Sequence, residues 1–161
     1  MELMTDPDEA SRQSRLVGIN MVVLSLRLRA NWARLFGDAE SAAIGLAIVA
    51  TVSDRLLRAD LEEELKSLSV PMPPEDLACC NIHSIAVATG LNREKARRKV
   101  DRLIAKGMVV RDHDTILLAP GFTQREITSS IVHEQLAEIR RVANTLLRMG
   151  VLTVRASTPE K

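Results

Sequence analysis

The chain has 161 residues, which is long enough for one domain with helical extensions and a buried core. Apolar residues make up 46% and charged residues 27%, the balance of a folded globular protein and not of a disordered one. Aromatic residues make up only 2%, which argues against a platform that stacks single-stranded bases, and the net charge of +1 does not by itself indicate a nucleic-acid partner.

The first part of the chain predicts two helices. Asp6 can cap a helix that keeps an apolar pattern up to Phe36, where Gly37 can end it. The middle of this helix is apolar on nearly every side, so we expect a second subunit to cover it. Asp38 can cap a second helix, at roughly 39–68, whose first half is apolar and whose second half is acidic; a break before the acidic stretch is compatible with the pattern.

A short helix, a turn, a basic helix and two strands are predicted next. In chain order they are a connector at 70–75, a helix at 82–89, a turn at Gly90, a helix from Arg93 to about Lys106, and strands at 108–111 and 115–119. Asn92 can cap the basic helix, Gly107 can end it, and Asp112-His113-Asp114 can join the strands.

The last predicted helix spans 124–149. Thr123 and Glu126 can form a capping box at its start, and Gly150 can end it. We expect the tail from Ala156 to be loose.

The predicted fold is mainly α: a winged helix-turn-helix with long N- and C-terminal helices and a small two- or three-stranded β wing. Three segments are expected. The sequence predicts an N-terminal dimerisation helix at 1–37, a winged helix-turn-helix domain at 38–121 with its motif at 82–107 and wing at 108–119, and a C-terminal dimerisation helix and tail at 122–161.

Positive charge is concentrated on the basic helix. From Arg93 to Arg111 there are eight basic and two acidic residues, a net charge of +6, so the rest of the chain is net acidic. Such a concentration is typical of phosphate binding, and the alternative is a solvated helix face.

The basic helix and its neighbours supply the candidate DNA-binding residues. We expect Arg97 and Arg98 to contact bases, at guanine O6 and N7; the alternative for both is a surface ion pair with Asp101 or Glu94. The other candidates are Asn92 and Arg93 at the mouth of the groove, Lys95, Lys99 and Arg102 on phosphates, Ser84 with the amides of the short helix on a phosphate, and Arg111 and His113 on the backbone or minor groove. Asp112 and Asp114 weaken the contribution of the strand turn.

Other reactive residues do not form a site in the sequence. Cys79 and Cys80 are interpreted as buried thiols, with a redox-sensing thiol as the less favoured alternative. His83 and His133 are expected to pack or lie on a helix face, and no metal or cofactor is predicted. No catalytic motif or signal peptide is present, and no apolar run is long enough to cross a bilayer, so we expect a cytoplasmic protein that is not an enzyme.

The run SIAVATGLNREKARRKVDRLIAKGMVVRD resembles the winged helix-turn-helix of bacterial transcription regulators. The flanking long helices are similar to those of multiple-antibiotic-resistance (MarR-type) regulators. This resemblance implies a homodimer with interlocked terminal helices on a pseudo-palindromic double-stranded DNA operator, with Arg97 and Arg98 among the reading residues. It also implies a cavity between the terminal helices and the winged part that could hold a small apolar effector.

Two functions are therefore expected from the sequence. The first is a sequence-specific double-stranded-DNA-binding regulator. The alternative is a winged-helix module that binds protein without DNA, which the modest net charge and the acidic strand turn favour.

Overall fold

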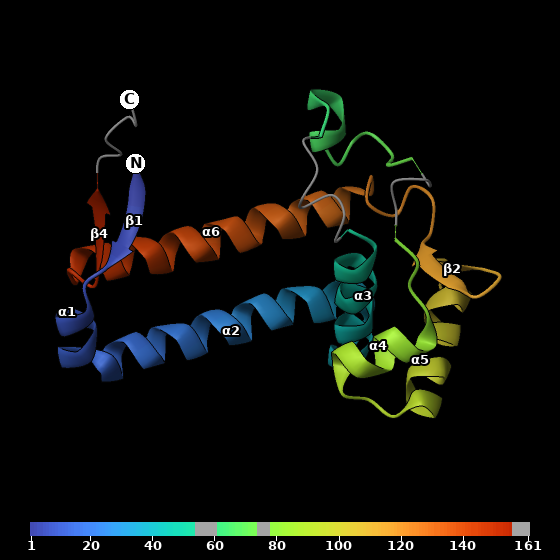
Figure 1. Cartoon of the computed structure of the whole chain (residues 1–161), viewed down its shortest axis with the longest axis horizontal. Coiled ribbons are helices and arrows are strands. Elements are labelled where there is room, and N and C mark those ends of the chain that lie inside the picture. The colour runs from blue at the N-terminus through green and yellow to red at the C-terminus, as the bar shows by residue number, and fades with distance from the viewer. Residues whose placement is uncertain (54–60, 74–77, 156–161) are drawn as a thin grey trace. The chain divides into compact units, whose positions relative to one another are not determined.

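The computed structural model describes residues 1–53, 61–73 and 78–155 (Figure 1). The chain divides into two compact units, residues 1–29 with 133–161 (unit 1) and residues 30–132 (unit 2). Both boundaries fall inside helices, whereas the sequence places them after residues 37 and 121. The predicted loose tail from Ala156 lies outside the described residues.

Unit 2 begins with the end of helix α2 (Ser14–Phe36) and continues into helix α3 (Ala39–Val52). The predicted cap is confirmed, because Asp38 Oδ1 accepts hydrogen bonds from the amides of Glu40 and Ser41 at 3.0 and 2.9 Å. The α3 helix stops well before residue 68. Residues 54–60 are outside the described part, and Glu63–Lys66 form one 3₁₀ turn, η1.

The predicted helix, turn, helix and strand order is confirmed. Helix α4 (Ile82–Thr89) ends at Gly90 in the left-handed conformation (φ 70°), and helix α5 (Arg93–Ala105) follows. Strands β2 (Val109–Asp112) and β3 (Thr115–Leu118) pair antiparallel and make the β2–β3 hairpin. The described residues add no third strand to it. One backbone bond, from Ile116 N to Cys80 O at 2.7 Å, ties the hairpin to the segment before α4.

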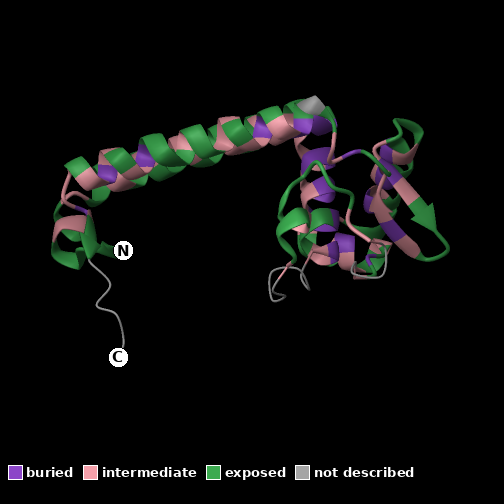
Figure 2. Ribbon diagram, turned by 90° about the horizontal axis from the view of Figure 1, so that it is seen from above, coloured by how far each residue is buried: buried purple, intermediate pink, exposed green. Residues whose placement is uncertain are grey.

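The core of unit 2 gathers the buried faces of these elements (Figure 2). The α3 helix contributes Ile44 and Ile48, and α5 contributes Ala96, Val100 and Leu103, as its pattern predicts. The Phe36 and Phe122 rings stack beside them at 5.7 Å between centroids.

Gly45 of α3 lies directly beneath the Phe36 ring. A Cβ built on Gly45 would come within 2.2 Å of that ring, whereas one built on Gly18 of α2 would meet no atom within 4 Å. Gly45→Ala is expected to lower the free energy of unfolding by about 1–3 kcal/mol through overpacking, although alanine favours helix. Gly18→Ala is the matched control and should raise it by about 0.5–1 kcal/mol. Urea unfolding followed by Trp32 fluorescence and circular dichroism measures both, and a stabilised Gly45→Ala would contradict this packing.

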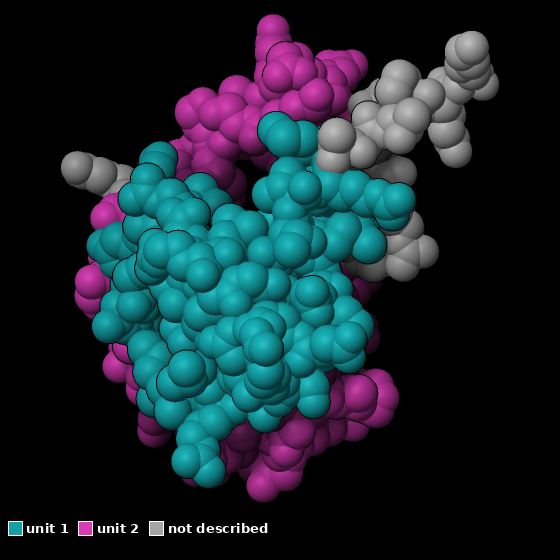
Figure 3. All heavy atoms as spheres, turned by 90° about the vertical axis from the view of Figure 1, so that its left-hand side faces the viewer, with its two compact units in different colours: residues 1–29, 133–161 teal, residues 30–132 magenta. Residues whose placement is uncertain are grey.

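Unit 1 is formed by the two ends of the chain (teal in Figure 3). It holds helix α1 (Pro7–Arg12), the first part of α2, most of helix α6 (Glu126–Arg148), and strands β1 (Glu2–Thr5) and β4 (Leu152–Arg155). The antiparallel β1–β4 pair, with Glu2 opposite Arg155, was not predicted, since its two strands lie at opposite ends of the chain and no turn joins them.

The long helices of unit 1 differ from the prediction at their starts. The expected continuous helix up to Phe36 breaks at Gln13, whose side chain donates to Met149 O at 2.8 Å. The α6 helix begins at Glu126, two residues later than predicted, and ends before Gly150 (φ 75°) as expected. The predicted capping box involves the Glu126 side chain, which lies outside the described atoms.

Unit 1 has little core of its own. Its buried cluster is Val142, Leu146 and Val151. Its exposed large apolar residues are Met1, Leu3, Met4, Leu16, Ile19, Met21, Val22, Leu26, Leu136, Ile139 and Val154. An apolar surface of this extent needs a cover in water.

Within the described ranges, no single helix has both the length and the apolar character to cross a membrane. The α2 and α3 helices reach that threshold only as a pair bent by 90°.

Candidate nucleic-acid interface

The α5 helix turns one side to the core and a charged side to solvent. Asn92 fixes its start, because Asn92 Oδ1 accepts a hydrogen bond from the Lys95 amide at 2.8 Å. The buried side seats the helix through its apolar residues. The exposed side carries Arg93, Glu94, Arg97, Arg98, Asp101 and Arg102.

A polar hollow of about 380 Å³ lies between the start of α4, α5 and the hairpin. Arg93 and Arg97 reach it from α5, and Arg111 reaches it from β2. Its other lining residues are Asn81, Ile82, His83, His113, Asp114 and Ile116. Three guanidinium groups from two elements therefore surround one concave surface, which suits a phosphate backbone.

Arg97 is exposed but paired. Its Nε and a terminal nitrogen donate to the two carboxylate oxygens of Glu94 at 3.2 and 2.8 Å. These bonds hold the pKa of the Glu94 carboxyl below its ordinary value. The surface ion pair that was predicted as the alternative for Arg97 is therefore present. Both side chains remain more than half exposed, so the pair still faces solvent.

Arg93, Arg98 and Arg102 are exposed and make no side-chain hydrogen bond or ion pair with any residue that the structure describes. Their contacts to bases or phosphates stay predictions. Arg98 thus differs from its neighbour Arg97.

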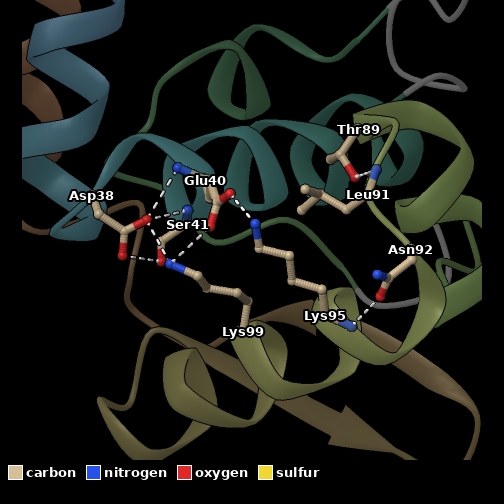
Figure 4. A network of polar contacts seen from close by, with 8 residues as sticks. All are labelled: Asp38, Glu40, Ser41, Thr89, Leu91, Asn92, Lys95 and Lys99. Atoms are coloured by element: carbon tan, nitrogen blue, oxygen red, sulfur yellow. Dashed lines mark hydrogen bonds and ion pairs between the residues drawn. The ribbon is translucent and has the colours of Figure 1, made fainter.

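Lys95 and Lys99 do not join this exposed side. Lys99 Nζ donates to Asp38 Oδ1 at 2.8 Å and lies 3.4 Å from Glu40 Oε2, while Lys95 pairs with Glu40 (Figure 4). The Lys99 side chain is only 12% exposed. The expectation that Lys99 neutralises a phosphate is therefore corrected, because the acidic first turn of α3 engages it, and the same turn pairs with Lys95, whose side chain is 40% exposed. We call this group the α3–α5 clamp.

The α3–α5 clamp makes the free energy of unfolding depend on pH. Lys99, together with the Ser41 amide, holds the pKa of Asp38 well below its usual value, and Lys95 lowers the pKa of Glu40. A carboxylate with a lowered folded-state pKa stabilises the protein above its unfolded pKa, and the contribution is lost as pH falls below about 4.

Two variants of Asp38 separate its roles as cap and ion-pair partner. Asp38→Ala is expected to lower the free energy of unfolding by about 1–2 kcal/mol at pH 7, since the cap is lost. Asp38→Asn keeps a capping side chain, so its smaller deficit reports the ion pair. Urea unfolding of the wild type and Asp38→Asn at pH 7 and pH 3 measures this, and a deficit that is unchanged at pH 3 would contradict the ion-pair contribution.

Ser84 stabilises the start of α4, and its hydroxyl group is already hydrogen-bonded there. Its Oγ accepts from the Asn81 amide at 3.0 Å and donates to the Asn81 carbonyl, while Asn81 Oδ1 accepts from the Ser84 amide. This reciprocal capping box corrects the proposed phosphate contact of Ser84. The Asn-x-x-Ser spacing was present in the sequence but was not recognised.

The cationic hairpin residues have acidic neighbours. Arg111 lies 3.5 Å from Asp101 of α5, and His113 Nδ1 lies 2.7 Å from Asp112 Oδ1. His113 has a left-handed backbone (φ 54°) in the two-residue turn. The contact between Asp112 and His113 therefore gives a structural reason for the expected weak contribution of the strand turn.

The cysteines differ in exposure, which corrects the expectation that both are buried. Cys79 is exposed and Cys80 is buried, and burial raises the pKa of the Cys80 thiol. In the part of the chain that the structure covers, no three His, Cys, Asp or Glu residues gather as metal ligands.

A second cavity, of about 250 Å³, lies within unit 2. It is lined by the end of α3, residues 65–72 and residues 118–124. Val52, Leu65, Met72 and Leu118 give it an apolar wall, and Lys66 lies among its lining residues.

No family model, no curated protein and no solved structure matches this chain. The class defined by the described residues is a mainly α protein with two small antiparallel strand pairs.

Proposed function

We propose that the chain is a sequence-specific double-stranded-DNA-binding transcription regulator that acts as a homodimer in the cytoplasm. The observation that carries this proposal is the exposed side of α5. It presents four arginines beside a hollow that Arg111 also lines, while the opposite side of the helix is sealed in the core. A helix presented in this way after a tight turn suits the DNA major groove.

The residues divide by chemistry. Arg98, which is exposed and makes no side-chain hydrogen bond or ion pair with a described residue, is the proposed reader of guanine, with Arg97 beside it. Arg93, Arg102 and Arg111 are the proposed phosphate contacts, while Asn92 and His113 lie at the margins. Lys95, Lys99 and Ser84 are omitted because they hold the fold together.

The exposed apolar surface of unit 1 supports a homodimer. Leu16, Ile19, Val22 and Leu26 lie on α2, and each is more than half exposed. A second copy would cover this surface with the same surface, as a two-fold interface requires. Two reading helices would then fit a pseudo-palindromic operator.

A small apolar effector is part of the proposal. The 250 Å³ cavity in unit 2 is just below the usual range of ligand pockets, so a compact ligand would suit it. Lys66 could attract an acidic group on such a ligand.

Salt titration of duplex binding tests the function. Three phosphate contacts per subunit predict a slope of log affinity against log salt of about −5, or about a 10³-fold loss between 50 and 200 mM salt. Fluorescence anisotropy with genomic fragments selected by the protein measures this slope. The same assay with added hydrophobic acids or phenols tests the effector, which should change the affinity for the duplex. Absence of duplex binding at 50 mM salt would end the proposal.

The second candidate is a module that binds a protein partner and not DNA. The carboxylates beside Arg97, Arg111 and His113 favour it, since each offsets a cation at the proposed interface.

A further inference from the structure

We propose that Glu94 and Arg97 act as one reading unit that selects a G·C base pair, with Glu94 as a specificity-determining residue. This inference rests on the proposed function. It assigns a role to a carboxylate that the sequence pattern offered only as a neutralising partner.

The two side chains form a two-pronged pair on the first turns of α5. Both Glu94 oxygens accept from Arg97, at 2.8 and 3.2 Å, and the side chains are 61% and 56% exposed. Asp101, the other carboxylate of α5, faces Arg111 instead. Glu94 is therefore the α5 carboxylate on the turns that reach base edges in this docking mode.

The pair keeps unused hydrogen-bonding groups. A guanidinium has five N–H donors, and two of them are used on Glu94, so three remain. The carboxylate retains lone pairs on both oxygens. The pair therefore presents both donors and acceptors from neighbouring side chains.

These groups complement a G·C pair in the major groove. Guanine offers the acceptors N7 and O6, and the adjacent cytosine offers the N4 donor. Arg97 matches the first two and Glu94 the third. An A·T pair presents acceptor, donor and acceptor in that order, so the thymine O4 would oppose the carboxylate.

The negative charge also disfavours incorrect sites. A carboxylate beside phosphates is repelled unless it meets a base donor, so Glu94 should weaken binding to unrelated duplexes. Its removal should therefore increase non-specific affinity while it reduces discrimination.

The experiment compares the selected operator with duplexes in which each G·C pair is replaced by A·T in turn. For the wild type we expect two positions per half-site, one read by Arg98 and one by the Glu94–Arg97 pair, to lose about 10- to 100-fold in affinity. Glu94→Gln should reduce that loss to less than about 5-fold at the position of the pair alone and should bind unrelated duplex more tightly. Arg97→Lys retains the positive charge but not the two-pronged guanidinium group, so it should reduce the discrimination at the same position. The double variant should be no worse than the more severe single one.

The matched control is Glu63→Gln, which removes the carboxylate of an exposed pair with Lys66 at the same spacing in η1. It should leave every position unchanged. Circular dichroism and thermal melting confirm that the variants fold. Tight operator binding with full discrimination by Glu94→Gln would overturn this inference and leave the proposed function standing. Failure of the wild type to bind any duplex would overturn both.

Discussion

Arg98→Glu is expected to lower the affinity for the operator by about 100-fold or more. Under the proposed function each subunit loses a base contact worth about 1–3 kcal/mol, and the proposed dimer loses it twice. The new carboxylate also repels the phosphates. Because Arg98 is exposed and makes no side-chain hydrogen bond or ion pair with a described residue, its replacement should leave the fold and melting temperature nearly unchanged. Anisotropy titrations at fixed salt measure the change.

Arg12→Glu is the control for this change in charge. It alters the net charge by the same amount at an exposed position of unit 1 in α1, outside α5. Its affinity for the operator should fall by less than about 3-fold, because salt screens the interaction between an exposed charge outside the proposed interface and the DNA. Equal affinity of Arg98→Glu and the wild type would favour the protein-binding candidate.

Leu26→Glu is expected to convert the protein to single chains. The wild type should show twice the chain mass of 17.8 kDa in light scattering at micromolar concentration, since unit 1 exposes apolar side chains on both long helices. Leu26 is 61% exposed in the single chain, so glutamate costs little there. In a two-fold interface it would bury two uncompensated charges, which costs several kcal/mol.

Val87→Glu is the control for the dimer. Val87 is 71% exposed on α4 of unit 2, so the same substitution should leave the mass at two chains. Operator affinity of Leu26→Glu should fall along with the mass, since one half-site alone binds weakly. A wild-type mass of one chain would contradict the dimer outright.

The helix-turn-helix order could be predicted because its signals are local. Gly90 needs a left-handed backbone, Asn92 caps the following amide, and apolar residues recur at the helical period between them and Gly107. Such signals lie within a few residues of each other. The boundaries of α4 and α5 therefore agree with the sequence to within a residue.

The predictions that were wrong or missing concern contacts between segments that are distant in the sequence. Periodicity placed Lys99 on α5, but only the approach of α3 decides that this lysine meets Asp38, 61 positions away, and not a phosphate. The β1–β4 pair joins positions 2 and 155 and has no local signal. The sequence thus predicted that α5 carries a concentration of basic side chains. It could not predict which of these side chains form ion pairs within the fold and which remain free.

The order of folding follows from where unit 1 lies in the chain. Its two halves are separated by all of unit 2, so every pairing between β1 and β4 closes a loop of more than a hundred residues. Closing so long a loop in a disordered chain carries a large entropic penalty, which is smaller once the intervening segment is compact. We therefore expect unit 2 to form early, and the joined ends to be the last part to fold and the first to open.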